Sequence, residues 1–235
     1  MARGTLFIIP ITIADTELSQ VLPSHNTEVI KPIRFFAVEK IKTARQFLRK
    51  MDREFPIDDS TFYEQDKHDD YSYQKEVIRH LLDGQDVGLI SESGYPAVAD
   101  PGYLIVAEAQ RNGVKVVPLV GPSSLLMALA ASGMNGQGFT FNGYLPVKEP
   151  DRSKQLQFII GLVQKTSFSQ IFIETPYRNE VIFKDFIKHC PSDMKVCVAL
   201  DITGPNETIV TQSIADWKKN PFRFDKTPCV FILGV

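Results

Sequence analysis

The sequence is poor in cysteine and has no long hydrophobic run. Its 235 residues include only three cysteines, odd in number and without metal-ligand spacing, which favours a reducing compartment. No stretch approaches the roughly 20 apolar residues of a membrane helix. The apolar run at residues 6–9 stops at Pro10 and acidic residues follow, which indicates a buried strand rather than a signal peptide. We therefore expect a cytoplasmic protein. The cysteines are Cys190, Cys197 and Cys229.

An excess of charge of one sign is also missing. The chain has 26 Lys and Arg against 28 Asp and Glu, a formal net charge of −2. No overall positive field would therefore draw it onto nucleic acid, although a local basic patch remains open. The four histidines are scattered without metal spacing, and His68 beside Asp69 and Asp70 is interpreted as part of a helix start. No metal is expected.

Apolar runs alternate with helical patterns through the first half of the chain. The pattern predicts strands at 6–10, 34–38, 61–63, 87–91 and 114–120. It predicts helices at about 41–51, 73–82, 103–111 and 123–132. This alternation is typical of a mainly parallel sheet flanked by helices, an α/β fold.

The second half has strands in closer succession. They are expected at 139–143, 170–173, 196–200, 207–211 and 229–234, with helices at 153–164, 179–189 and 213–219. Close succession favours antiparallel pairs within a mixed sheet. We expect two α/β domains, residues 1–120 and 121–235.

Three loops combine Gly or Pro with small polar residues directly after a predicted strand. They are PITIAD at 10–15, SESGYP at 91–96 running on to DPG at 100–102, and GPSS at 121–124. Ligands of parallel α/β sheets bind beyond the carboxyl ends of strands, where small residues let the backbone approach closely. Any one loop alone reads as ordinary turn chemistry. Three together favour a ligand site.

An ordered series of motifs then resembles one family. SESGYP at 91–96 resembles S-D-A-G-T-P, ADPGY at 99–103 resembles S-D-P-G-Y, and VPLVGPSS at 117–124 resembles V-P-x-P-G-P-S-A. ETPYR at 174–178 resembles E-S-P-H-R. The series is similar to the tetrapyrrole methylase-like class of S-adenosylmethionine-dependent methyltransferases. Within that class it most resembles the branch that 2′-O-methylates a cytidine of small-subunit ribosomal RNA.

The resemblance implies a fold, a cofactor and partners. It implies two α/β domains with S-adenosylmethionine in the cleft between them, an acceptor cleft in the N-terminal domain, and a homodimer. Ribosomal RNA or the small ribosomal subunit would be the partner, with no membrane. The implied cofactor contacts are Pro10, Glu92, Ser93, Gly94, Val98, Ser123, Ser124, Glu174, Ala199 and Pro228.

The chain departs from that branch mainly in its substrate motifs. The branch's P-T-P-I-G-N-L reads PITIADT at 10–16, and its E-D-T-R-H-T reads EKIKTA at 39–44, so that Lys40 replaces a carboxylate. Its H-N-E corresponds to about QDK at 65–67, and Asn206 and Glu207 stand where it has R-G. The motifs that the resemblance assigns to the cofactor are therefore largely retained, whereas those that it assigns to the substrate differ in most residues.

Methyl transfer to a hydroxyl needs a proton acceptor, and two carboxylates follow strands that face the expected cleft. Glu39 and Glu92 are the candidate catalytic bases; the alternatives are a solvated carboxylate at a helix start for Glu39, and a loop charge or cofactor contact for Glu92. Asp100 is interpreted as an N-cap or turn carboxylate rather than a base. Arg178 is either a phosphate ligand or a surface arginine.

Other charged residues leave alternatives open. Lys42, Arg45 and Arg49 are spaced to share one helix face, which would attract RNA or simply be solvated. Three functions follow: methylation of a ribosomal RNA ribose, methylation of a different, small acceptor, or cofactor binding without catalysis.

Overall fold

The computed structural model describes residues 2–65, 72–100 and 102–235. The chain forms two compact units, 1–123 and 124–235. The expected boundary after residue 120 lies three residues before this division, so residues 121–123 belong to the first unit. Asp66 with Lys67, the segment His68 to Asp70, and Pro101 lie outside the described residues, and the interpretations made of them stay predictions.

The first unit contains a five-stranded sheet. Its strands lie in the order β3-β2-β4-β1-β5, and every pair is parallel. This is the parallel sheet that the βα alternation predicts. The strands are β1 (Thr5–Ile8), β2 (Phe35–Val38), β3 (Thr61–Glu64), β4 (Val87–Ile90) and β5 (Lys115–Pro118).

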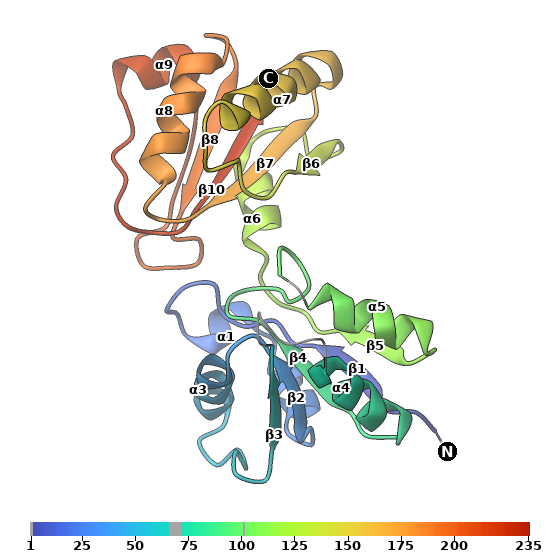
Figure 1. Cartoon of the computed structure of the whole chain (residues 1–235). Helices are drawn as coiled ribbons and strands as arrows, with labels where there is room; N and C mark the ends of the chain where they lie inside the picture. The colour runs from blue at the N-terminus through green and yellow to red at the C-terminus, as the bar shows by residue number, and fades with distance from the viewer. Residues whose placement is uncertain (1, 66–71, 101) are drawn as a thin grey trace. The chain divides into compact units, whose positions relative to one another are not determined.

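Helices cover both faces of this sheet because its strands are apolar on both sides. In β2, Phe36 and Val38 belong to one apolar cluster, whereas Ala37 between them belongs to another. Helix α3 packs into the first cluster, and α4 and α5 pack into the second (Figure 1). The helices are α1 (Leu18–Val21), α2 (Ser24–Ile30), α3 (Ile41–Met51), α4 (Ser72–Leu82) and α5 (Tyr103–Arg111).

The second unit contains a mixed sheet in the order β6-β7-β10-β8-β9. Only β6 and β7 pair in parallel, and the other three pairs are antiparallel. The expected mixed sheet is confirmed. The strands are β6 (Phe139–Phe141), β7 (Ser169–Glu174), β8 (Lys195–Leu200), β9 (Thr208–Ser213) and β10 (Cys229–Gly234).

One apolar cluster joins this sheet to three of its helices, α7 (Asp151–Thr166), α8 (Asn179–His189) and α9 (Ile214–Lys219). Within it, Trp217 donates its indole N–H to the Val196 carbonyl at 2.9 Å and meets Phe183 edge-on. The opposite face carries α6 (Ser124–Ser132), and Met134, two residues beyond the end of this helix, lies against Gly234 of β10. The α/β fold class predicted from the sequence is therefore confirmed.

Two short helices, α1 and α2, lie where the sequence pattern predicts no element. Neither helix has an N-cap side chain that bonds the first turn, and α1 buries none of its residues. Local sequence therefore carries little signal for them. Among the helices of the described residues, none is long and apolar enough to cross a membrane.

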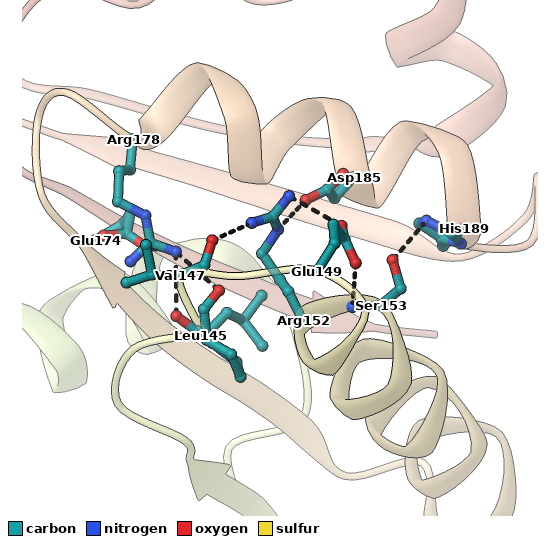
Figure 2. Close-up of polar contacts among 10 residues, drawn as sticks. Leu145, Val147, Glu149, Arg152, Ser153, Glu174, Arg178, Asp185 and His189 are labelled. Carbon is teal, nitrogen blue, oxygen red and sulfur yellow. Dashed lines mark hydrogen bonds and ion pairs between the residues drawn. The ribbon is translucent and has the colours of Figure 1, made fainter.

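Arg152 ties the start of α7 to α8 in the second unit (Figure 2). Its Nε donates to Asp185 at 2.6 Å, one terminal nitrogen donates to the Val147 carbonyl at 2.6 Å, and the other donates to Glu149 at 2.9 Å. The side chains of Arg152 and Asp185 are 12% and 15% exposed. Three nitrogens of one planar group thus serve three separate acceptors.

Arg152→Lys is expected to lower the free energy of unfolding by about 1–2 kcal/mol, because one ammonium cannot reach all three acceptors. Urea unfolding would measure the change. The control is Arg111→Lys, since Arg111 is 73% exposed and its one ion pair with a described residue is with Glu108, one turn away. We expect that change to stay within about 0.5 kcal/mol. Equal losses in both variants would contradict the assigned role of Arg152.

Candidate functional site at the carboxyl ends of the parallel strands

The three loops predicted to carry chemistry follow β1, β4 and β5, which are neighbours in the sheet. The carboxyl ends of parallel strands meet at one edge, so these loops start side by side. The Ile11 amide donates to the Gly94 carbonyl at 2.9 Å, and the Ser93 hydroxyl donates to the Ile13 carbonyl at 3.4 Å. The first and second loops are therefore joined directly.

The third loop packs against both of the others. A Cβ on Gly121 would lie 2.2 Å from Cγ of Pro10, so only glycine allows this approach. A Cβ on Gly94 would lie 3.7 Å from the Pro122 carbonyl oxygen, and Gly94 has a φ of +65°, which favours glycine. All three loops thus converge within the first unit.

Asp100 organises the end of the second loop. Its carboxylate accepts the Gly102 amide at 2.7 Å and the Ala97 amide at 2.9 and 3.0 Å. Ala97 and Ala99 have positive φ values of 64° and 63°, a conformation rare for alanine. The interpretation of Asp100 as a turn carboxylate is confirmed.

Glu39 and Lys40 follow β2 and both reach Glu92, which follows β4. Glu39 Oε2 accepts the Glu92 amide at 3.0 Å, and Lys40 Nζ lies 2.7 Å from Glu92 Oε1. Glu39 Oε1 takes part in no hydrogen bond among the described residues. The two candidate bases therefore have different surroundings: Glu92 is paired with an ammonium, and Glu39 keeps one free oxygen.

A hollow in the first unit lies beside Glu39, with about 240 Å³ of empty space including its solvent-open mouth. The ends of β2 and β4 and the start of α5 form its walls. Its polar side chains come from Glu39, Gln65, Tyr73, Ser91 and Asp100. The free oxygen of Glu39 therefore belongs to a group that lines a recess.

Burial changes the acidity of both carboxyl groups in this hollow. The pKa of Glu39 is raised, mainly because it is partly removed from water, and Glu92 and Asp100 raise it further through their negative charge. The amide of Glu92 and the ammonium of Lys40 act in the opposite direction. Burial likewise raises the pKa of Asp100, although the hydrogen bonds that it accepts from the Gly102 and Ala97 amides lower it. A raised pKa makes Glu39 a stronger proton acceptor once ionised.

The remaining predicted cofactor residues are distributed over both units. In the first unit, Val98 is 45% exposed and Ser123 lies in the third loop, while Ser124, the last residue of that loop, begins α6 of the second unit. The cofactor contacts of these three residues stay predictions.

In the second unit, strand pairing brings three further predicted residues to one edge of the sheet. Cys229 of β10 lies opposite Glu174 of β7 on one side and Leu200 of β8 on the other. Pro228 precedes Cys229 and Ala199 precedes Leu200, so both lie next to this row of paired residues. Glu174 and Ala199 are buried, whereas Pro228 is exposed. Their contacts with a cofactor stay predictions.

Arg178 is held inside the second unit (Figure 2). Its guanidinium donates to the carbonyls of Leu145 and Pro146 at 3.1 and 3.2 Å and lies 3.3 Å from the buried Glu174 carboxylate. It thereby joins the segment FNGYLP at 141–146 to ETPYR at 174–178, which is one of the motifs that resemble the family. Arg178 is therefore not a free surface arginine. Some of its donors are already used within the second unit, so not all of them are available to a phosphate.

The basic residues of α3 lie on its exposed side. Lys42, Arg45 and Arg49 are exposed, while Ala44, Phe47 and Leu48 are buried. The guanidinium of Arg45 lies 5.2 Å from the centroid of the Phe62 ring, and Arg49 donates to the Arg53 carbonyl. The expectation that the three share the exposed side is confirmed, and their attraction for RNA stays a prediction.

The sequence analysis gave no individual role to several side chains of the hollow. Ser91 belongs to the second loop and Gln65 to the motif position at 65–67, and both directly follow strands, β4 and β3. Tyr73 on α4 offered no signal beyond an apolar ring in a helix. Glu64 ends β3 and accepts the Ile41 amide at 2.8 Å, which caps α3 from a neighbouring strand.

Solved structures with the same architecture are methyltransferases. The methyltransferase CobJ superposes with a TM-score of 0.62 at 16% identity, covering 100% of this chain and 94% of that chain. Uroporphyrin-III C-methyltransferase from Thermus thermophilus, solved with S-adenosylhomocysteine, gives 0.58 at 17% identity, covering 98% and 97%. At these identities the likeness shows the fold alone.

Sequence comparison supplies the family. The model of the tetrapyrrole (corrin/porphyrin) methylases matches residues 27–217, and the chain belongs to this family of methyltransferases. Ribosomal RNA small subunit methyltransferase I of Vibrio cholerae is 31% identical over 212 residues, covering 90% of this chain and 69% of that protein. The protein of the same name from Pseudomonas aeruginosa is 28% identical and covers 100% and 80%. The resemblance seen in the motifs is thereby confirmed.

Proposed function

We propose that this chain transfers the methyl group of S-adenosylmethionine to a ribose 2′-hydroxyl of small-subunit ribosomal RNA. The observation that carries the proposal is the convergence of the loops after β1, β4 and β5, with Glu39 beside them. Family membership supports methyl transfer, and the names of the similar proteins from Vibrio and Pseudomonas support the RNA acceptor.

The converging loops fit a ligand such as S-adenosylmethionine. At Gly121 a Cβ would clash with the ring of Pro10, and at Gly94 the positive φ favours glycine, so both glycines suit the close approach of the loops. Among the described residues, the amides of Ser93 and Gly94 donate no hydrogen bond within the chain, so both remain available to a ligand. Pro10, Glu92, Ser93 and Gly94 are the residues that we assign to the cofactor in the first unit.

When bound, S-adenosylmethionine would supply an activated methyl group on a positively charged sulfur. The ribose oxygen would form the O–C bond with its own lone pair, and the electron pair of the broken C–S bond would stay on the sulfur, giving a neutral thioether. Glu39 takes the hydroxyl proton at Oε1, while Oε2 stays fixed on the Glu92 amide. Holding the acceptor in line supplies up to roughly 7–11 kcal/mol, and proton transfer adds about 10²–10⁴-fold.

Methyl incorporation tests the proposal. The purified chain would be incubated with methyl-labelled S-adenosylmethionine and small ribosomal subunits that lack the modification, and the RNA would be digested to nucleosides. We expect label in a 2′-O-methylated nucleoside. Cofactor binding without label in the RNA would contradict the proposed acceptor.

A second acceptor class is supported by the rewritten substrate motifs, in which Lys40 stands where the similar branch has a carboxylate. Activity on a small molecule, with none on the ribosomal subunit, would establish that function. Binding of the cofactor without turnover on any acceptor would indicate a silent homologue. As a modifier of ribosomal subunits the chain would act in the cytoplasm, as the homodimer that the resemblance implies, which light scattering would test.

A further inference from the structure

We propose that Lys40 binds the phosphate next to the hydroxyl that is methylated, and that its ion pair with Glu92 is the resting state that the acceptor replaces. This inference rests on the proposed function, because it concerns the same acceptor. It assigns a substrate contact to a residue at which this chain departs from the motif of the similar branch.

The first support is geometric. Glu39 and Lys40 are consecutive, and both side chains contact Glu92. Glu39 Oε2 lies 3.0 Å from the Glu92 amide nitrogen, and Lys40 Nζ lies 2.7 Å from Glu92 Oε1. A proton acceptor and a cation therefore lie next to each other. In RNA the 2′-hydroxyl and the 3′-phosphate stand on neighbouring carbons of one ribose, so the two groups match the two side chains.

The second support is the charge around Lys40. Among the described residues, the charged groups that influence it are Glu92, Glu39 and Glu64, all carboxylates, and hydrogen bonding to Glu92 raises the pKa of Lys40. Lys40 is therefore protonated at neutral pH. Without this ammonium, the charged groups at Glu39, Glu92 and Glu64 would all be carboxylates, which would repel a phosphate.

The third support is that the resting pair is easily exchanged. The side chains of Lys40 and Glu92 are 59% and 38% exposed, and ion pairs so exposed contribute little to stability. Water can solvate Glu92 when Lys40 leaves it. A lysine behaves as a flexible point charge with three donors, so it can turn from a carboxylate to a phosphate without moving the backbone.

The test compares Lys40→Met and Lys40→Arg with a matched control, Lys184→Met. Lys184 is 72% exposed and paired with Glu180 at 2.6 Å on α8, so it is the same kind of ion pair away from the site. The acceptor is the small ribosomal subunit lacking the methyl group. KM for the subunit, kcat and S-adenosylmethionine affinity would be measured for each variant at several salt concentrations.

For Lys40→Met we expect KM to rise about tenfold, kcat and cofactor affinity to stay within about threefold, and the salt dependence to lose about one charge contact. Lys40→Arg should restore most of the lost affinity, and Lys184→Met should resemble wild type. An unchanged KM and salt dependence in Lys40→Met would overturn the inference while leaving the proposed function standing. An equal loss of cofactor affinity would also overturn it. No methylation of the subunit by wild type would defeat both.

Discussion

Glu39→Gln is expected to lower kcat by about 10²–10⁴-fold, the usual contribution of a positioned general base. The amide oxygen of glutamine can still accept the Glu92 N–H, so the loop after β4 should keep its place. S-adenosylmethionine affinity should therefore change little. Single-turnover methylation and calorimetry would separate these two quantities.

Glu64→Gln is the matched control for this variant. Glu64 also ends a strand of the same sheet and also accepts one backbone amide, that of Ile41 at 2.8 Å, but it does not line the hollow. Its activity should stay within about threefold of wild type. If Glu39→Gln kept full activity and Glu92→Gln did not, the base would be Glu92; if both kept it, neither carboxylate would be the base.

The pH dependence of the wild type follows from the same residue. Burial raises the pKa of Glu39, and a general base acts only when ionised. Activity should therefore be full at high pH and fall as the pH drops through that raised pKa, above the usual range of a glutamate. This acid limb should be absent from the residual activity of Glu39→Gln.

Gly121→Ala is expected to lower S-adenosylmethionine affinity at least about tenfold. The new Cβ would lie 2.2 and 2.4 Å from ring atoms of Pro10 and 3.1 Å from Leu22, so the third loop must move away from the first. Such overpacking costs about 1–3 kcal/mol, and the displacement would separate the loops that form the proposed site. Calorimetry with the cofactor would measure the loss.

Gly161→Ala provides the control for added volume alone. Gly161 lies within α7, and a Cβ there would meet no atom within 4 Å. Alanine is the better helix former by about 1 kcal/mol, so this variant should be as stable as wild type or more so, with unchanged cofactor affinity. Unaltered affinity in Gly121→Ala would contradict the proposed role of the third loop.

Much of the fold could be predicted because local pattern and tertiary structure agree. Alternating apolar runs and amphipathic helices gave the strands and most helices, and helix α3 was located to the residue, Ile41–Met51. The meeting of the loops followed from one rule, that parallel strands end at the same edge. Short helices without caps, such as α1 and α2, carry no comparable signal.

The internal arrangement of the site could not be predicted in the same way. Glu39 and Glu92 are 53 residues apart, and nothing in either segment indicates that one would accept the amide of the other. The Lys40–Glu92 pair depends on rotamers that only the packed loops select. Likewise, the sequence left Arg178 open as a phosphate ligand, because its carbonyl partners at residues 145 and 146 come from a distant loop.

The central claim is that the loops after β1, β4 and β5 bind S-adenosylmethionine. Calorimetric titration of the wild-type chain with this cofactor tests it most directly. We expect saturable binding of one molecule per chain. Absence of binding at millimolar cofactor, by a chain shown to be folded, would contradict it.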